Sequence, residues 1–392
     1  MYIDILSDNY NIDISKMKKD EKIIDELILL VENKILKFPY KKTYINNPLI
    51  LFNNLKNINL DVSHKPYKLY SYFPKYGAFL PHRFRNKQTS IISCTNEIYY
   101  NADVLSDYFI EDIRIKTHRH NEKQSVYKAW ENKAFLKKIF NLALQKQEFN
   151  PENIRTIITQ NISENKVFNP TWAKSLIKLV LGDDIIGKKW LDISAGWGDR
   201  LITAMSLNME YLGFDPNTDL INGHNKMIEL FGDTNKHKII YEPFETSIIP
   251  PNEYDIILSS PPFFNIEEYS SSQNNQSIIK FPNFNEWMIK FLFTSLLKAW
   301  ISLKIGGYLV LHICDTFNLR LAEPTNLFIR NFLINSSFEG IIGIKGMSGY
   351  TRPVWVWKKL DTPKTFTYKN ENTNSLKNSY NQLYKNWIKN KI

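Results

Sequence analysis

The sequence has few cysteines and no long apolar run, and both shortages limit what the protein can be. Of its 392 residues only Cys94 and Cys314 are cysteines, and neither has a second Cys or His at metal-ligand spacing. A disulfide framework and a metal site are therefore not expected. Apolar stretches such as 27–31 and 291–297 are much shorter than a membrane span, and no basic-then-apolar signal segment opens the sequence. We therefore predict an intracellular, cytoplasmic protein of a reducing compartment, with no membrane partner.

Acidic residues are outnumbered by basic ones, mainly at the two ends of the chain. The net charge is +10, and residues 1–150 carry 24 Lys and Arg against 17 Asp and Glu. Residues 359–392 carry 7 against 2, so the stretch between these two segments is slightly acidic. Basic segments that flank a nearly neutral block are typical of a protein that holds a polyanion. An AT-rich genome would also explain the excess of basic residues, because its proteins are rich in Lys as well as in Asn and Ile.

The N-terminal part is predicted to be a mainly helical, basic domain. Apolar residues recur near the helical period over 23–36. The stretch 65–100 is aromatic and basic instead and includes Arg83 and Arg85. Aromatic rings can stack on bases while arginines follow the phosphates, although a small core with a solvated rim would have a similar composition. We interpret residues 1–150 as a substrate-positioning domain, with these two arginines as candidate nucleic-acid contacts.

The following part of the chain alternates between strand and helix patterns, which is typical of an open, mostly parallel α/β sheet. Helices are predicted over 171–181, 199–207, 218–231, 285–303 and 324–334, and strands over 189–193, 211–214, 237–241, 254–259, 307–314, 339–345 and 354–358. We therefore predict an α/β domain over residues 165–360. The remaining residues, 361–392, are polar and basic and are expected to form a tail or a loose helix.

Two glycines one residue apart, Gly196 and Gly198, stand where the first predicted strand turns into a helix. They belong to the run Asp192-Ile-Ser-Ala195-Gly-Trp-Gly198. Glycine lets the backbone turn tightly and approach a ligand without a Cβ in the way. The third glycine of the dinucleotide fingerprint is missing. Since many strand-to-helix turns use glycine for steric reasons alone, this turn does not by itself define a ligand.

Acidic residues follow the next two predicted strands. Asp215 comes directly after the second strand, where a carboxylate can accept hydrogen bonds from both hydroxyls of a ribose. A helix-capping role for Asp215 is less favoured, because Asn217 is better placed to cap the following helix. Glu242 and Phe244 follow the third strand. The order of these residues places a candidate nucleotide site along the carboxyl ends of the strands.

The fourth predicted strand ends in Ser260-Pro261-Pro262-Phe263. This motif resembles the D/N/S-P-P-Y/F/W signature of methyltransferases that modify planar nitrogens. The lone pair of an exocyclic amino group is delocalised into the ring, and two acceptors, the Ser260 side chain and the Pro261 carbonyl, can draw the nitrogen toward tetrahedral geometry by taking its two hydrogens. The prolines fix φ, and Phe263 can stack on a flipped base. Two prolines after a strand can also be a simple chain reversal.

The three motifs in this order resemble the class I S-adenosylmethionine-dependent amino-methyltransferases, and are similar to DNA adenine-N6 and cytosine-N4 methyltransferases of phages and large viruses. The resemblance implies a Rossmann-like, seven-stranded class I methyltransferase domain whose last two strands form an antiparallel hairpin. It implies S-adenosylmethionine as the cofactor and Ser260, Pro261, Pro262 and Phe263 as catalytic residues. The cofactor-binding residues that it implies are Asn169, Thr171, Asp192, Ala195, Gly196, Gly198, Asp215, Glu242 and Phe244.

The resemblance leaves the substrate open. With serine at its first position, the motif resembles that of the cytosine N4 enzymes. With Phe263 in place of tyrosine, it resembles the motif of RNA enzymes, including those that act on cap-adjacent adenosine. We favour DNA slightly over RNA, and we keep a protein glutamine methyltransferase and a non-catalytic binding subunit as alternatives. Gln276, in the polar segment 267–284, and Arg352, beside the last strand, are further candidate substrate contacts. The sequence does not indicate an oligomeric state.

Overall fold

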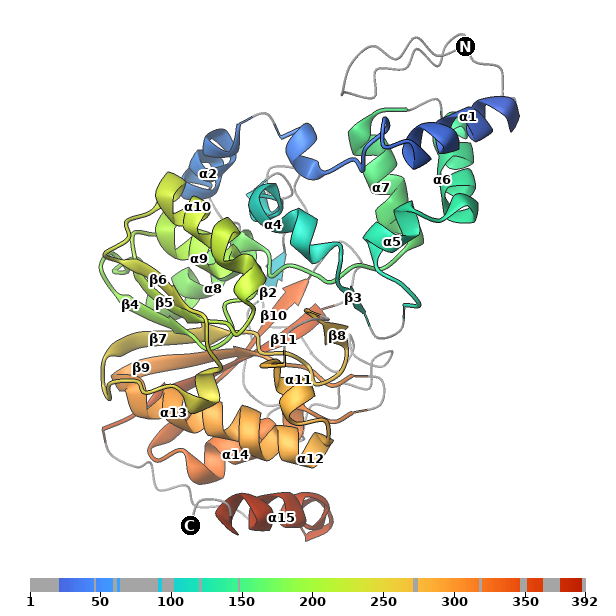
Figure 1. Cartoon of the computed structure of the whole chain (residues 1–392). Helices are drawn as coiled ribbons and strands as arrows, with labels where there is room; N and C mark the ends of the chain where they lie inside the picture. Colours follow the sequence, from blue (N-terminus) through green and yellow to red (C-terminus); the bar gives the residue numbers. More distant parts are fainter. Residues whose placement is uncertain are drawn as a thin grey trace.

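The structure is a computed structural model, and its two main parts are a group of helices and a larger α/β body (Figure 1). Arg83, Arg85 and most of the aromatic-basic stretch around them lie outside the residues that it describes. The described residues are 21–45, 47–58, 62–63, 91–93, 102–119, 122–146, 149–270, 274–316, 319–345, 351–361 and 374–389.

A nine-stranded sheet forms the centre of the described part of the chain, in the order β1-β2-β10-β11-β9-β7-β4-β5-β6. Its strands are β1 (Val62–Ser63), β2 (Ile91–Ser93), β4 (Lys189–Asp192), β5 (Glu210–Phe214), β6 (His237–Ile240), β7 (Tyr254–Ser259), β9 (Leu303–His312), β10 (Ser336–Lys345) and β11 (Thr351–Lys359). From β6 to β9 the neighbours are parallel, and β11 is antiparallel to both β9 and β10. The seven neighbouring strands from β10 to β6 therefore have the Rossmann-like class I methyltransferase order, with the predicted antiparallel hairpin. The predicted fold class is confirmed.

Helices cover both faces of the sheet (Figure 1). They are α8 (Pro170–Leu181), α9 (Asp199–Ser206) and α10 (Ile221–Phe231) on one face, and α13 (Thr294–Ser302) and α14 (Ala322–Phe332) on the other. Neighbouring strand residues point to opposite faces, so Trp190 packs in the core under the first group and Leu191 in the core under the second. This layering fixes the ends of the parallel strands and thus the positions of the residues that follow them.

The helix predicted over 285–303 is divided in the structure. It consists of α12 (Phe284–Glu286), a π-helical segment η7 (Trp287–Phe293) and α13. Because the π-helical segment closes its turns over five residues, it rotates the following helix, and the Thr294 hydroxyl donates to the Ile289 carbonyl at 2.9 Å. Similarly, the helix predicted over 218–231 begins with a 3₁₀ turn, η5 (Thr218–Leu220), before α10.

The N-terminal part divides between the two bodies of Figure 1. One group, α1 (Glu21–Glu32), α5 (Val126–Trp130), α6 (Lys133–Gln145) and α7 (Pro151–Asn161), has an apolar core of its own. In contrast, α2 (Pro48–Asn57) and α4 (Asp107–Arg114) pack on α9 and α10, and β2 pairs with β10. The α4 contact is close: a Cβ on Gly223 would lie 2.3 Å from Ile110 Cγ2. Parts of residues 1–150 thus belong to the α/β body.

The segment predicted as a polar tail contains the helix α15 (Asn374–Lys389). Its residues Leu383 and Trp387 are buried in the core on the α14 side of the sheet. The Trp387 ring meets that of Phe328 edge to face at 4.9 Å between centroids. Tyr384, between them, packs on Phe332, and its hydroxyl donates to the Pro324 carbonyl at 3.0 Å, so one face of the helix docks on this core. Among the described residues, no helix has the length and the apolar character needed to cross a membrane.

A buried ion network joins the two bodies. Arg114 donates to both carboxylate oxygens of Asp107, at 2.7 and 2.8 Å, and Arg155 contacts Glu111 at 2.8 Å and Glu164 at 2.5 Å. These side chains are at most 7% exposed. Burial opposes their ionisation, but the arginine charges outweigh it and lower the pKa of Asp107 and of Glu164. The network connects α4 and α7 to the segment that leads into α8.

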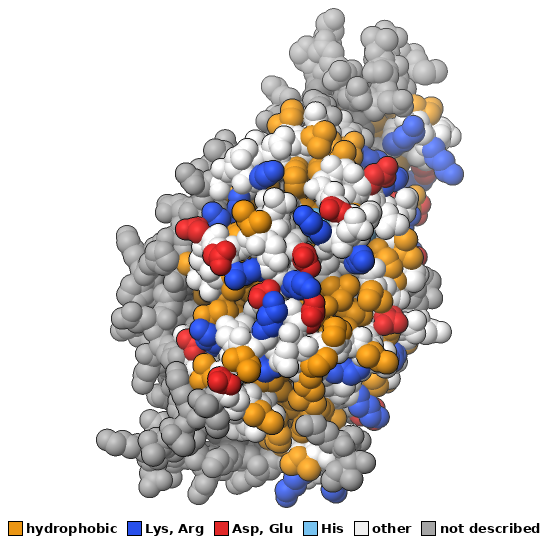
Figure 2. All heavy atoms as spheres, turned by 90° about the vertical axis from the view of Figure 1, so that its left-hand side faces the viewer, with side chains coloured by type: hydrophobic (Ala, Val, Ile, Leu, Met, Phe, Trp, Pro, Cys, Tyr) orange, Lys and Arg blue, Asp and Glu red, His pale blue; other side chains and the backbone are white. Residues whose placement is uncertain are grey.

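Surface charge is mixed on the face drawn in Figure 2. Among its coloured atoms, Lys and Arg side chains are interspersed with Asp and Glu and with apolar side chains, without a broad area of one sign (Figure 2). A polyanion would therefore gain little from this face.

Candidate active site

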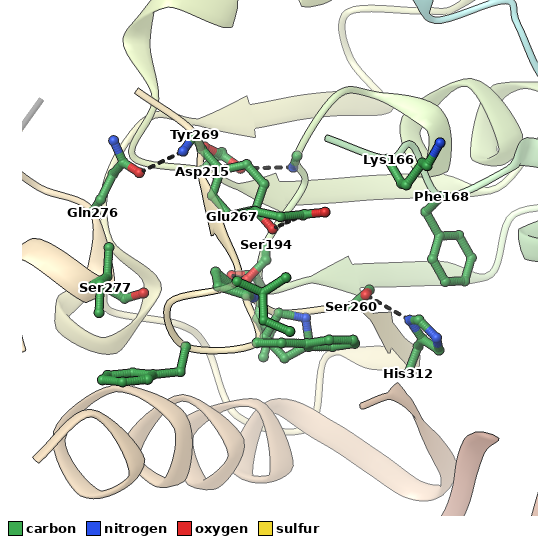
Figure 3. Close-up of a pocket in the computed structure, with 18 of the residues that line it drawn as sticks. Lys166, Phe168, Ser194, Asp215, Ser260, Glu267, Tyr269, Gln276, Ser277 and His312 are labelled. Atoms are coloured by element: carbon green, nitrogen blue, oxygen red, sulfur yellow. Dashed lines mark hydrogen bonds between the residues drawn. The ribbon is translucent and has the colours of Figure 1, made fainter. Parts of the chain in front are cut away.

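A cavity of about 700 Å³ opens where the parallel strands β4, β5, β7 and β9 end. In open α/β sheets this edge is where ligands bind. Figure 3 shows its wall, with Asp215, Ser260 and His312 each directly after or at the end of a different strand. Of the residues singled out in the sequence, it is lined by Gly196, Asp215, Phe244, Ser260, Pro261, Pro262, Phe263, Gln276 and Arg352.

Asp192 lies beneath the cavity instead of lining it. Its side chain is fully buried and accepts hydrogen bonds from Arg200 Nε at 2.6 Å, Tyr211 Oη at 2.8 Å and Ser259 Oγ at 2.7 Å. Arg200 also donates to the Ser194 carbonyl and does line the cavity. Asp192 therefore ties the carboxyl ends of β4 and β7 to the Tyr211 side chain of β5, and it places a guanidinium beside the glycine turn.

The two glycines of the turn have different constraints. Gly196 has a left-handed φ of +59°, and its N–H donates to Asp215 Oδ2 at 2.8 Å. Gly198 does not line the cavity; its φ is +91°, and a Cβ there would lie only 2.7 Å from Met227 Sδ in α10. Ala195, beside them, is buried. Gly196 therefore leaves space on the cavity side, whereas Gly198 allows the turn to pack on α10.

Asn169 and Thr171 are used away from the cavity. The Asn169 amide donates to Asp103 Oδ2 at 2.8 Å, and the Thr171 hydroxyl donates to Asp103 Oδ1 at 2.8 Å. Burial raises the pKa of Asp103 to about 7. These contacts fix the start of α8 to the segment before α4, and neither side chain is among those that line the cavity.

Two acids follow the third strand, and they are placed differently. Glu242 is exposed and lies off the cavity, whereas Glu245, in the 3₁₀ turn η6 (Phe244–Thr246), lines it together with Phe244. Glu245 is paired with Lys280 at 2.7 Å. Glu245 is buried in the 3₁₀ turn that begins after Pro243, and its side chain faces the cavity whereas that of Glu242 is exposed.

Ser260 and His312 meet at the ends of neighbouring strands. Ser260 Oγ lies 2.9 Å from His312 Nδ1 (Figure 3). His312 was not identified in the sequence, where its only signal is that it falls within the fifth predicted strand, 307–314. Two residues beyond Pro262, Phe264 has a left-handed φ of +58° and packs against Trp287. Such a backbone conformation is costly outside glycine and is found at functional turns.

A short two-stranded sheet follows the Ser260–Phe263 motif. Here β8 (Glu267–Glu268) pairs with β3 (His118–Arg119) from the N-terminal part. Gln276 accepts from the Tyr269 N–H at 3.3 Å and donates to the Ser270 carbonyl. Gln276 thus holds the loop in shape as well as lining the cavity (Figure 3).

Cationic side chains stand around the cavity: Arg119, Lys166, Arg200 and Arg352 line it. Arg119 is 3.5 Å from Glu267, and burial lowers the pKa of Lys166. In the described part of the chain, no group of His, Cys, Asp and Glu side chains is arranged to hold a metal ion.

No family model matches the sequence, and no curated protein matches it. Among solved structures, TrmN from Thermus thermophilus is 18% identical over 49% of this chain and 49% of that chain, with a TM-score of 0.36. A SAM-dependent O-methyltransferase from Thermotoga maritima is 13% identical over 54% and 71%, with a TM-score of 0.34. A 1,6-didemethyltoxoflavin-N1-methyltransferase from Burkholderia thailandensis, with bound S-adenosylhomocysteine, is 12% identical over 49% and 78%, with a TM-score of 0.35. The chain thus spans about half the length of the first of these.

Proposed function

We propose that this protein is an S-adenosylmethionine-dependent N-methyltransferase that acts on the exocyclic amino nitrogen of a nucleic-acid base, adenine N6 or cytosine N4, with DNA favoured over RNA. One observation carries the proposal: Ser260 and Pro261 line the same cavity as Gly196 and Asp215. A methyl donor held by the glycine turn and an amino group held by the motif would therefore meet in one enclosed space.

The residues around the glycine turn suit the cofactor. Asp215 is a partly buried acceptor at the end of β5, placed for ribose hydroxyls, and Phe244 provides an apolar wall for adenine. Gly196 leaves open the space that a side chain would fill, and Arg200 can offset the methionine carboxylate. S-adenosylmethionine supplies an electrophilic methyl group on a positively charged sulfur.

The motif residues would orient and activate the amino group. Ser260 Oγ and the Pro261 carbonyl accept its two hydrogens, which turns the nitrogen lone pair out of the plane of the base. With the methyl donor held by the glycine turn, the amino nitrogen would take the methyl group and would give up one proton, which Ser260 Oγ or the Pro261 carbonyl would hold until it passes to solvent. Phe263, which lines the cavity, stacks on the base. Alignment of the two reactants supplies much of the rate.

The three parts of the chain are assigned different roles, and the first is substrate positioning. We assign residues 1–150 to this role, residues 165–360 to cofactor binding and catalysis, and residues 361–392 to a basic C-terminal segment. Arg119, Lys166 and Arg352 at the cavity are the described cations that can contact phosphates next to the target base. Strong dependence of activity on salt would follow from such contacts.

Transfer of a labelled methyl group tests the proposal directly. The protein would be incubated with labelled S-adenosylmethionine and unmodified DNA, capped RNA or uncapped RNA, followed by digestion to nucleosides and mass spectrometry. N6-methyladenosine or N4-methylcytidine, or their deoxy forms, is the expected product and identifies both the base and the nucleic acid. Transfer to glutamine in a protein extract, with none to nucleic acid, would contradict the proposal, and so would a protein that binds no S-adenosylmethionine.

Replacing Asp215 by asparagine is expected to weaken S-adenosylmethionine binding by about tenfold or more at pH 7.5, because one charged acceptor for the ribose hydroxyls is lost. Burial raises the pKa of Asp215 to about 6. The carboxylate is therefore present above pH 6 and lost below it, so cofactor affinity of the unmodified protein should fall as the pH drops through 6. Titration calorimetry between pH 5 and pH 8 measures both effects.

Glu229→Gln is the control for this experiment, since Glu229 is an exposed acid in α10 that does not line the cavity. It should bind the cofactor normally at each pH. The Asp215→Asn protein should also lose the dependence on pH near 6. Normal affinity in that variant would show that another residue holds the ribose.

A further inference from the structure

His312 is a second polar group beside the proposed target nitrogen. Strands β7 and β9 are parallel, with Ser259 opposite Leu311, so the next residues of both strands, Ser260 and His312, emerge side by side. The Oγ to Nδ1 distance of 2.9 Å is that of a hydrogen bond (Figure 3). This contact is set by the sheet rather than by a loop, so its geometry is firmly held.

The surroundings of His312 keep the imidazole neutral. The residue is 5% exposed, and the rings of Phe168 and Phe263 each lie 5.5 Å from it, centroid to centroid. Burial, assisted by the charges of Arg352 and Arg200, lowers the pKa of His312 to about 3. A neutral imidazole has one nitrogen that donates and one that accepts.

The role of Ser260 determines which nitrogen carries the hydrogen. For Oγ to accept a hydrogen from an amino group, its own hydrogen must be directed elsewhere, and Nδ1 is the acceptor within reach. The imidazole hydrogen is then on Nε2. Within the described part of the chain, Nε2 is buried and has no hydrogen-bond partner, although His312 lines the cavity. A buried polar group without a partner is costly and calls for an explanation.

We propose that His312 is a positioning and specificity residue for methyl transfer: Nδ1 fixes Ser260 as an acceptor for the amino group, and the Nε2 hydrogen is donated to the ring nitrogen next to that group. The proposal rests on the nucleobase substrate proposed above. In adenine this ring nitrogen is N1 and in cytosine it is N3, and each is bonded to the carbon that carries the amino group. His312 would thus recognise the amino group and its neighbouring acceptor as one unit.

The test removes the ring nitrogen from the substrate and the imidazole from the protein, separately and together. The substrates are oligonucleotides with adenine or 1-deazaadenine at the target position, or cytosine and 3-deazacytosine if methyl transfer identifies cytosine. The proteins are the unmodified chain, His312→Ala and His312→Asn. Asparagine retains a polar atom near the position of Nδ1 and lacks the Nε2 donor.

The unmodified protein is expected to lose about tenfold in kcat/KM when the ring nitrogen is removed, the value of one hydrogen bond. His312→Ala should lose about 10- to 100-fold on the natural base, mainly in kcat, and should then be insensitive to the ring nitrogen, within about twofold. His312→Asn should regain part of the kcat lost in the alanine variant and remain insensitive. S-adenosylmethionine affinity, measured by calorimetry, should change little in both variants.

A variant that loses the same factor on the deaza base as the unmodified protein would overturn the proposal, because the ring nitrogen would then be recognised elsewhere. If His312→Ala fails to fold, the asparagine variant decides the question by the same comparison. An unmodified protein that transfers methyl to no nucleic acid would instead contradict the proposed function. The two failures are therefore distinguishable.

Discussion

Replacing Ser260 by alanine is expected to reduce the rate of methyl transfer by about 100- to 1000-fold, the usual loss when one oriented polar group at a reacting centre is removed. In the proposed mechanism the hydroxyl accepts a hydrogen from the amino group, and its contact with His312 at 2.9 Å orients it. The contacts around Asp215 and Gly196 do not involve Ser260. The rate is measured under single turnover, and the cofactor affinity, measured by calorimetry, should remain unchanged.

Ser163→Ala is a suitable control, since Ser163 is an exposed serine just after α7 and away from the cavity. It should retain full activity. If Ser260→Ala transferred methyl normally, the amino group would have to be held by other acceptors and the proposed mechanism would be wrong. A large loss of cofactor affinity in the same variant would instead place Ser260 in the cofactor site.

Replacing Arg114 by methionine is expected to lower the free energy of unfolding by about 3–5 kcal/mol. Methionine retains the length of the side chain but leaves the carboxylates of Asp107 and Glu164 buried without this arginine, which now contacts them at 2.7 and 3.3 Å. Breaking a buried ion network by removing one partner is costly because an uncompensated charge stays buried. Urea denaturation followed by circular dichroism measures the change.

The control for this variant is Lys133→Met, which removes a pair with Glu32 at 2.9 Å between side chains that are 72% and 38% exposed. Its effect should be under about 1 kcal/mol, because solvent screens exposed pairs. Equal effects of the two substitutions would mean that the buried network contributes no more than a surface pair. Such a result would remove the structural argument for a fixed connection between α4, α7 and α8.

The α/β fold was predictable because each parallel strand is a short apolar run followed directly by a turn. The predicted strand 254–259 has the bounds of β7, and most of the others differ by a few residues. The division at η7 was not predicted, since its apolar residues Trp287–Phe293 also suit an α-helix. Strands β1 and β2 have two and three residues, too few for a period-2 pattern. Helix α15 is difficult to predict because Leu383, Tyr384 and Trp387, which pack on the core, are separated by Asn and Lys.

The site was predictable where a residue directly follows a strand, as Asp215 and Ser260 do. The sequence does not show which side chain faces inward where the path of the backbone decides this. After β6, for example, Glu245 lines the cavity and Glu242 does not. His312 required the strand order, because Ser260 and His312 are 52 positions apart and become neighbours only when β7 pairs with β9. The use of Asp192 beneath the turn likewise depends on Arg200 folding back across it.

The pairing of β2 with β10 determines how this protein could be divided. A fragment beginning at residue 165 would contain the whole cavity edge of the sheet, yet it would lose β2 and the helices α2 and α4. The end of β10, residues 343–345, would then expose the N–H and C=O groups that β2 now pairs. The apolar surfaces of α9 and α10 that α2 and α4 now cover would be exposed as well. Open margins of this kind recruit strands from other molecules. Such a fragment is expected to self-associate more readily than the whole chain, because part of its sheet edge and an apolar helix surface would be uncovered.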